Sequence, residues 1–171
     1  MKRTPIDWRD YSPTLAKGLP GGLLLTARAG DKINSMTIGW GTLGINWSRP
    51  VFAVYVRDSR FTKTLLDQNP EFTVNAALTA PDKHALGICG AKSGRDCDKL
   101  ALAGLTPVPG VHVSVPGLRE FPLTLECRVI YSQREDLSRL DEEIVGKYYP
   151  GAQDLHTVYY GQIVDAYLLE D

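Results

Sequence analysis

Glycine and proline are spread along the chain, with 16 and 11 copies among 171 residues, and they are not gathered into a linker. Both residue types interrupt helices and strands, so the elements between them must be short. Many of the intervening stretches are rich in β-branched and aromatic residues, which is typical of strands joined by turns. The sequence therefore predicts a single domain over residues 1–171 that is mainly β.

The clearest predicted strand is residues 123–131, where apolar side chains at odd positions alternate with mostly polar ones. Residues 157–168 repeat this pattern, and the continuous apolar run at 51–56 predicts a strand buried on both faces. Residues 30–32 separate two further runs and predict a hairpin, because Gly and Asp tolerate a positive φ. The two runs are residues 23–29 and 34–41, and residues 72–76 are a shorter strand candidate.

Helical signals are short and lie between the strands, at residues 61–67, 81–89 and 98–103. Ser59 is expected to cap the first helix, and a glycine follows each of the other two. The strands and helices do not alternate as βαβ units, which argues against a doubly wound parallel sheet. A closed or partly closed antiparallel barrel with a few short helices fits better.

Basic and acidic residues almost balance, 19 against 20. This balance argues against nucleic acid as a partner, because binding through counterion release needs a concentrated positive field. The longest apolar runs, such as 51–56, fall far short of the roughly 18 residues that span a bilayer. The N-terminus lacks the apolar core of a secretory signal. We therefore expect a cytoplasmic protein that does not bind membranes.

Three cysteines, Cys89, Cys97 and Cys127, are an odd number and contain no CxxC pair. A chain of this length does not need disulfides to bury a core. We therefore expect free thiols in a reducing compartment.

Small polar side chains begin one of the predicted hairpin strands, at residues 34–37. Alternation places Asn34 and Met36 on one face and Ser35 and Thr37 on the other. A ligand lying along the edge of this strand would meet side chains and backbone amides together. A hairpin strand with one solvated face would show the same pattern, so this segment alone leaves both interpretations open.

Three cations and two hydroxyls gather in the turn at residues 57–63, between the buried strand and a short helix. Helix N-terminal N–H groups, hydroxyls and guanidinium groups are what a phosphate monoester requires. The turn is therefore a candidate anion site. A solvated turn in which Asp58 neutralises an arginine is the alternative.

A long loop with two glycines and several basic residues spans residues 89–100. Lys92-Ser93 invites comparison with the phosphate loop of nucleoside triphosphatases, but Ala91 stands where that motif requires glycine, and a helix precedes it. We therefore reject a nucleoside triphosphatase. The loop is either a lid that folds over a ligand or a solvated surface loop.

Other reactive residues form no convincing site. His84 and Cys89 are five residues apart, which places them poorly on one helical face, and no third metal ligand is evident. Glu142 and Glu143 are adjacent and point apart on a helix. The sequence predicts no catalytic side chain and no metal site, so redox or group-transfer chemistry would have to come from a bound cofactor.

In their order and spacing, these segments resemble the flavin reductase-like, flavoredoxin-type proteins with the FMN-binding split-barrel fold. The resemblance covers roughly residues 10–170, and it departs from many relatives where they have Asp-Pro-Pro and this chain has Ser48-Arg49-Pro50. The matching stretches are Asn34-Ser35-Met36-Thr37 followed by Trp40, then Pro50, Ser59-Arg60-Phe61-Thr62, Ser93-Gly94-Arg95-Asp96-Cys97-Asp98-Lys99-Leu100 and Ala103-Gly104-Leu105.

The resemblance implies a homodimer that binds FMN noncovalently at the subunit boundary. The residues that would line the isoalloxazine ring are Asn34, Ser35, Met36 and Thr37. Those that would hold the phosphate are Arg57, Ser59, Arg60 and Thr62. Those that would reach the flavin or its phosphate from the loop are Ser93 and Lys99.

The implied function is a flavin reductase that transfers a hydride from NADH or NADPH to flavin. Two alternatives stay open: an electron-transfer flavoprotein of the flavoredoxin kind, which a partner protein reduces, and a non-catalytic flavin-binding module. No GxGxxG unit with a downstream acidic residue is present, so the sequence does not choose between NADH and NADPH. It also does not identify the final electron acceptor.

Overall fold

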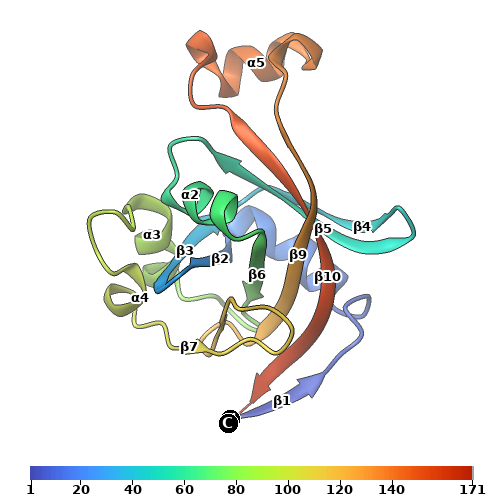
Figure 1. Ribbon diagram of the computed structural model, residues 1–171, viewed down its shortest axis with the longest axis vertical. Helices are drawn as coiled ribbons and strands as arrows, with labels where there is room; N and C mark the ends of the chain where they lie inside the picture. Colours follow the sequence, from blue (N-terminus) through green and yellow to red (C-terminus); the bar gives the residue numbers. More distant parts are fainter. Residues whose placement is uncertain (171) are drawn as a thin grey trace.

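The computed structural model describes residues 1–170 as a curled antiparallel sheet with helices on its outside and an arm that extends from one end (Figure 1). The strands are β1 (Lys2–Pro5), β2 (Leu23–Ala29), β3 (Lys32–Ile38), β4 (Gly41–Asn46), β5 (Arg49–Arg57), β6 (Glu71–Ala76), β7 (Pro107–Val108), β8 (Gly117–Leu118), β9 (Leu123–Arg134) and β10 (His156–Glu170). The α-helices are α1 (Ser12–Gly18), α2 (Phe61–Gln68), α3 (Lys83–Ala91), α4 (Lys99–Leu102) and α5 (Glu142–Tyr148). The short 3₁₀ helices are η1 (Leu19–Gly21), η2 (Leu137–Arg139) and η3 (Pro150–Ala152).

The main sheet runs in the order β3-β2-β6-β9-β10-β5-β4, and β1 pairs with β10. Its two edge strands, β3 and β4, follow each other in the chain and are separated only by Gly39 and Trp40. The three residue-to-residue steps from Ile38 to Gly41 span at most about 10 Å. In a flat sheet, the six spacings between seven strands would separate the two edge strands by about 29 Å. The sheet must therefore curl until its two edges approach at this link. Because β3 and β4 do not pair with each other, the barrel stays split, as the family resemblance implied.

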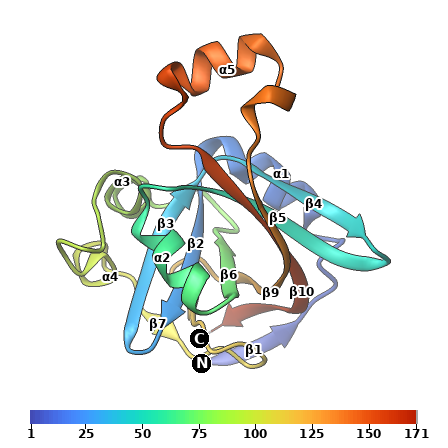
Figure 2. The ribbon, with the colours of Figure 1, turned by 45° about the horizontal axis from the view of Figure 1, so that its top comes forward.

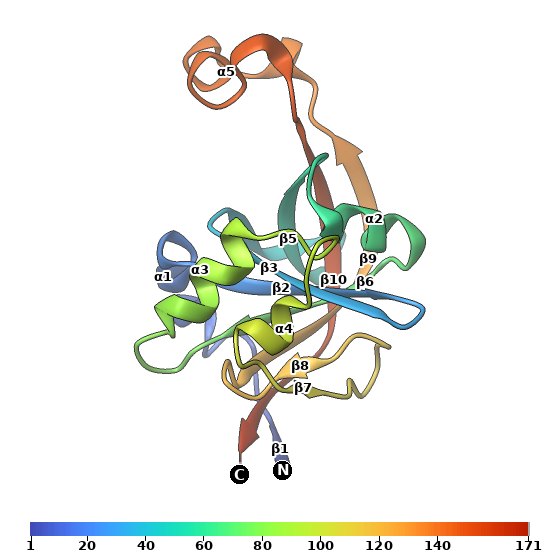
Figure 3. The ribbon, with the colours of Figure 1, turned by 90° about the vertical axis from the view of Figure 1, so that its left-hand side faces the viewer.

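Two apolar cores cover both faces of β2. Leu23 and Leu25 pack into the barrel interior, which also holds Phe52 and Phe72. Leu24 points the other way, into a second core that α3 and α4 share. Figure 3 shows α3 and α4 on the same side of the β2–β3 hairpin. The uninterrupted leucine run of β2 is explained by this burial on both faces.

The predicted hairpin forms, with β2 and β3 paired on either side of Gly30, whose φ is +55°. The second strand ends at Ile38 rather than at residue 41, because Gly41 already begins β4. The prediction that residues 51–56 are buried on both faces holds for all but Tyr55, which is half-buried.

The outer face of β9 differs from the prediction. Thr124 and Glu126 occupy the polar positions of the alternation, yet both are fully buried. The Glu126 carboxylate accepts hydrogen bonds from the backbone N–H groups of residues 111–113 at 2.6–3.1 Å and from the Tyr167 hydroxyl at 2.8 Å. The loop between β7 and β8 is thus fastened over this face, a long-range contact that alternation along one strand does not reveal.

Helix α2 begins at residue 61 as predicted, whereas α3 and α4 begin at Lys83 and Lys99, slightly later than the predicted 81 and 98. Ser59 does not cap α2, since its N–H and hydroxyl both donate to the Asp154 carboxylate. Asp82 caps α3 by accepting from the N–H groups of the second and third helical residues. Asp98 caps α4 in a similar way.

Beyond the barrel, β9 and β10 continue and carry residues 135–155, which we call the arm (Figures 1 and 2). The arm contains η2, α5 and η3, and α5 has no buried residue. Among residues 1–170, no helix combines the length and hydropathy needed to cross a membrane.

Candidate functional site

A cavity of about 130 Å³ lies where the free edge of β3 meets the start of α2 and the loop after α3. We call it the basic cavity because, within the described residues 1–170, three cations and no carboxylate line it. Its lining residues are Asn34, Met36, Ser59, Arg60, Phe61, Thr62, Ala91, Lys92, Ser93, Gly94 and Lys99. The three segments that the sequence singled out, far apart in the chain, therefore meet at one place.

Asn34 and Thr62 join β3 to α2 at the floor of the basic cavity. The Asn34 side chain donates from Nδ2 to the Thr62 Oγ1 at 2.8 Å, and both residues are almost fully buried. Since the Thr62 oxygen accepts here, its own proton stays available to a ligand. Gly94 closes over this pair, and a Cβ there would lie 2.1 Å from the Asn34 Oδ1. Only glycine lets the loop approach β3 this closely.

The positive charge of the basic cavity is held by backbone carbonyls. Lys99 is 3% exposed, and its Nζ donates to the Cys89 carbonyl at 3.1 Å. The Arg60 guanidinium donates to the Gly90 carbonyl at 2.7 Å. Both carbonyls belong to the last turn of α3, which carries the negative end of the helix dipole. These partial charges hold the cations in place but do not neutralise them.

Burial lowers the pKa of the Lys99 ammonium, and the nearby Arg60 lowers it further. Burial also raises the pKa of the Cys89 thiol, which keeps that sulfur protonated. A buried ammonium without a carboxylate partner is costly. The basic cavity is therefore suited to an anion that supplies the missing negative charge.

The polar residues of β3 divide between the two faces as the alternation predicted. Asn34 and Met36 line the basic cavity. Ser35 is fully buried, and its hydroxyl lies 2.7 Å from that of Thr26 on β2, so it offers a ligand only its backbone. Thr37 donates to the Leu86 carbonyl of α3 at 2.6 Å.

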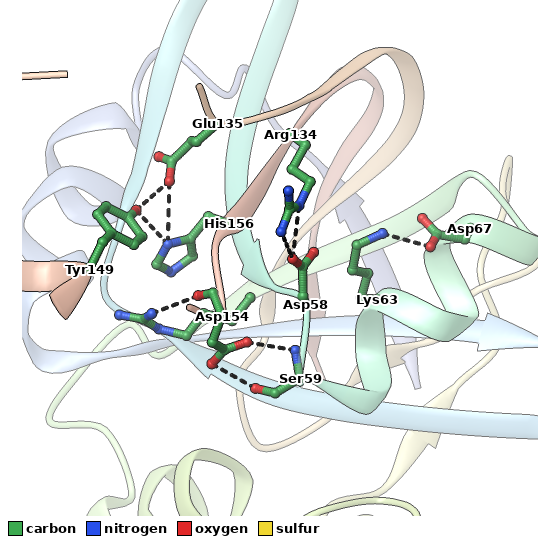
Figure 4. Close-up of polar contacts among 10 residues, drawn as sticks. Asp58, Ser59, Lys63, Asp67, Arg134, Glu135, Tyr149, Asp154 and His156 are labelled. Atoms are coloured by element: carbon green, nitrogen blue, oxygen red, sulfur yellow. Dashed lines mark hydrogen bonds and ion pairs between the residues drawn. The ribbon is translucent and has the colours of Figure 1, made fainter. Parts of the chain in front are cut away.

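The Arg57 guanidinium and the N–H and hydroxyl of Ser59 contact the arm. The Arg57 guanidinium donates to the carbonyl oxygen of Asp154 at 2.8 Å and lies over the Tyr149 ring. The Ser59 N–H and hydroxyl donate to the Asp154 carboxylate at 2.7 and 2.9 Å (Figure 4). The structure thus separates the four residues of the predicted anion turn: Arg60 and Thr62 have polar groups at the basic cavity, whereas Arg57 and Ser59 fasten the arm.

The loop after α3 is fixed to α2 by Arg95. Its guanidinium donates to the Ser59 carbonyl at 2.9 Å and to the Thr64 hydroxyl at 3.3 Å, and it lies over the Phe61 ring. This clamp holds Ser93 at the rim of the basic cavity. The loop therefore closes over the cavity as a cover, one of the two arrangements that the sequence left open.

A second cavity, of about 180 Å³, adjoins the first and shares Met36 and Arg60 with it. We call it the aromatic cavity because Trp40, Tyr55 and His156 line it. Sequence reasoning missed Tyr55 and His156 as site residues. A histidine at the start of the C-terminal strand was the available signal, but nothing local shows that β10 lies beside β5.

Cys89, Cys97 and Cys127 are free thiols, as expected. The Cys89 carbonyl accepts a hydrogen bond from Lys99, and His84 is exposed on α3. Among residues 1–170, no cluster of three or more His, Cys, Asp or Glu side chains is arranged to hold a metal ion.

Comparison with known proteins identifies a matching family and similar structures. The sequence model described as the flavin reductase like domain matches residues 19–171. The structure of flavoredoxin from Methanosarcina acetivorans is similar with a TM-score of 0.66 and 28% identity, over 87% of this chain and 68% of that one. Flavoredoxin of Desulfovibrio vulgaris (Miyazaki F) has a TM-score of 0.65 and 25% identity, over 87% and 69%.

An uncharacterised protein of Archaeoglobus fulgidus is 32% identical over 100 residues, which are 58% of this chain and 55% of that protein. The chain therefore matches only about half the length of this curated relative.

Replacing Lys99 by methionine should stabilise the protein in the absence of a ligand, because it removes a buried charge that has no carboxylate partner. We expect the free energy of unfolding at pH 7 to rise by about 1 kcal/mol, measured by urea denaturation. The difference in stability between the variant and the native protein should shrink as the pH rises from the lowered pKa of Lys99 to the ordinary lysine value. Over this range the folded native protein has lost the Lys99 proton, whereas its unfolded chain still carries it, so the native protein gains stability. A variant less stable than the native protein across this range would contradict the assignment of Lys99 as an uncompensated cation.

Proposed function

The chain belongs to the flavin reductase-like domain family, and we propose that it is an FMN-dependent flavin reductase that accepts a hydride from NADH or NADPH. The observation that carries the proposal is the basic cavity, in which Arg60 and Lys99 lie without a carboxylate beside the unpaired edge of β3. FMN combines a dianionic phosphate with a flat polar ring, and these two features match the two halves of the site.

The phosphate of FMN would bind at the start of α2. Arg60 and Lys99 would supply charge, and the hydroxyls of Thr62 and Ser93 would supply hydrogen bonds. The first N–H groups of α2 would add further donors. Ser59 lines the same cavity and Arg57 lines the neighbouring one, so both stay within the proposal as ligands, although their present partners are on the arm.

The isoalloxazine ring would lie along β3. That strand pairs only with β2, so its outer edge presents unpaired backbone groups to a ligand. Asn34 and Met36 would meet the ring through side chains, and Ser35 and Thr37 through the backbone of the same strand. When bound, FMN supplies the redox chemistry, while the protein binds, orients and excludes water. No side-chain nucleophile is required.

An electron-transfer flavoprotein of the flavoredoxin kind is the second candidate function. The two flavoredoxins, with 28% and 25% identity over 87% of this chain, favour it. In that case a partner protein, rather than a nicotinamide, would reduce the flavin. A module that binds flavin without reducing it is the third candidate.

We further propose that the protein forms a homodimer through an apolar patch, defined as the exposed side chains of Ile45, Trp47 and Tyr131 and the half-buried Tyr160. Ile45 and Trp47 are 60% and 57% exposed, and the Trp47, Tyr131 and Tyr160 rings pack together at 5.5–5.9 Å between centroids. Trp47 and Ser48 form the β4–β5 turn with φ of +50° and +56°, a conformation usually left to Gly or Asn. A strained turn that exposes a tryptophan is consistent with an interface.

Anaerobic mixing of the FMN-loaded protein with NADH or NADPH tests the reductase proposal. We expect the flavin absorbance to bleach within seconds with at least one of the two nucleotides, because hydride transfer reduces the ring. Flavin that stays oxidised with both nucleotides but is bleached by a reduced electron-carrier protein would instead establish the flavoredoxin-type function. A protein that stays colourless after incubation with FMN would contradict flavin binding altogether.

Arg60→Ala should lower the affinity for FMN by about tenfold to a hundredfold, since a hydrogen bond to a charged group contributes roughly 1.5–3 kcal/mol. The affinity for riboflavin, which lacks the phosphate, should change much less. Fluorescence quenching titrations with both flavins measure this difference. Arg49→Ala is the matched control, because Arg49 is exposed on β5 and bonds Gln162 rather than the basic cavity. An equal loss of affinity for FMN and riboflavin would contradict the assignment of Arg60 to the phosphate site.

Trp47→Gly should weaken the dimer by about thirtyfold or more, as the loss of a central aromatic contact costs about 2 kcal/mol. Glycine suits the left-handed turn, so the fold should not suffer. Sedimentation velocity over a range of concentrations measures the dissociation constant. Val111→Ser, at an exposed position outside the patch, should leave it unchanged. A native protein that is monomeric at all concentrations would refute the proposed interface.

A further inference from the structure

A group of titratable side chains lies outside the basic cavity, where the arm joins β10. It consists of Glu135, Tyr149 and His156, whose side chains point toward one another (Figure 4). His156 is 6% exposed and Tyr149 is 2% exposed. The proposed reductase function gives this buried group no role.

The hydrogen bonds within this group determine which imidazole nitrogen carries the proton. The Tyr149 hydroxyl contacts the Glu135 carboxylate and lies 2.7 Å from the His156 Nδ1. A carboxylate only accepts, so the single proton of the tyrosine points to Glu135. The tyrosine oxygen must then accept from Nδ1–H of His156. A neutral imidazole has one N–H, and therefore Nε2 is left as an acceptor.

The surroundings keep these protons in place at neutral pH. Burial lowers the pKa of His156, and the Arg57 guanidinium lowers it further, against the opposing effects of Glu135, Asp154 and Asp58. Burial and the Glu135 carboxylate raise the pKa of Tyr149 far above its ordinary value. The imidazole is therefore neutral, and the tyrosine remains a donor.

The His156 ring also lies at the wall of the aromatic cavity. His156 lines this cavity together with Trp40 and Tyr55, and the centroids of the His156 and Trp40 rings lie 4.9 Å apart. Among residues 1–170, the His156 Nε2 has no hydrogen-bond partner, and this atom is not fully buried. The cavity volume of about 180 Å³ is enough for one six-membered ring, because a cavity of about 150 Å³ holds benzene.

We propose that the aromatic cavity binds a small planar aromatic molecule that carries an O–H or N–H donor. His156 accepts a hydrogen bond from this donor at Nε2. Tyr149 and Glu135 are positioning residues that hold the imidazole in its acceptor tautomer. The arm is then part of the binding site, since it carries both positioning residues. The bound molecule would lie next to the occupant of the basic cavity, because the two cavities share Met36 and Arg60.

The test uses phenol as the probe and anisole, in which a methyl group replaces the donor proton, as its matched control. Nitrogen NMR of the full chain labelled with ¹⁵N-histidine reports the tautomer of His156. We expect a protonated Nδ1 and an unprotonated Nε2 in the native protein. Phenol should shift the Nε2 resonance, and anisole at the same concentration should not.

Tyr149→Phe removes the acceptor of Nδ1–H and should give a mixture of the two tautomers. The affinity for phenol should fall about threefold to tenfold, which corresponds to one neutral hydrogen bond. Tyr148→Phe is the matched control on the same arm, since no hydrogen bond is found for its hydroxyl within residues 1–170, and it should change neither quantity. Glu135→Gln should lower the pKa of His156 further, because it removes a negative charge.

Three results would overturn the proposal: a native His156 protonated at Nε2, equal shifts with phenol and anisole, or an unchanged tautomer and affinity in Tyr149→Phe. None of these readouts depends on flavin reduction. A failure of the reductase proposal would therefore leave this test unaffected, and the reverse also holds.

Discussion

The two-residue link Gly39-Trp40 is the constraint on which the rest of the structure depends. It joins the opposite edges of a seven-strand path, so the sheet curls, yet β3 and β4 do not pair and the barrel stays split. The split leaves the outer edge of β3 unpaired, and α2 and the loop after α3 complete a site along it.

Charge within this split explains why the site suits an anion. Among residues 1–170, the side chains of Arg60 and Lys99 bond only carbonyl oxygens at the C-terminal end of α3, whose partial charges stabilise cations without neutralising them. A carboxylate partner would have satisfied the same cations but would also have repelled a phosphate. The Asp154 carboxylate accepts hydrogen bonds from Ser59 and so ties the arm to the turn before α2. The arm brings Tyr149 to His156 through the same attachment.

Local patterns predicted the hairpin around Gly30 and the buried strand β5, and the family resemblance implied that residues 34–37 and the turn before α2 share one site. Each of these follows from the residues within a single segment or from a family resemblance that spans the chain. The roles of Asp154 and Glu126 could not be predicted, since their partners lie 95 and 13–41 residues away along the chain. The aromatic cavity was missed for the same reason, because it exists only once β10 lies beside β5.

The central claim, that the basic cavity binds the phosphate of FMN as a dianion, is tested most directly by ³¹P NMR of protein-bound FMN over a range of pH. Cations held close to a phosphate favour its charged form and lower its second pKa, which is about 6 for a free monoester. We expect the ³¹P chemical shift of the bound phosphate to stay constant between about pH 5 and 8 in the native protein. In Arg60→Ala, the shift should change with pH over this range. A bound phosphate that titrates near 6 in the native protein, as free FMN does, would contradict the account.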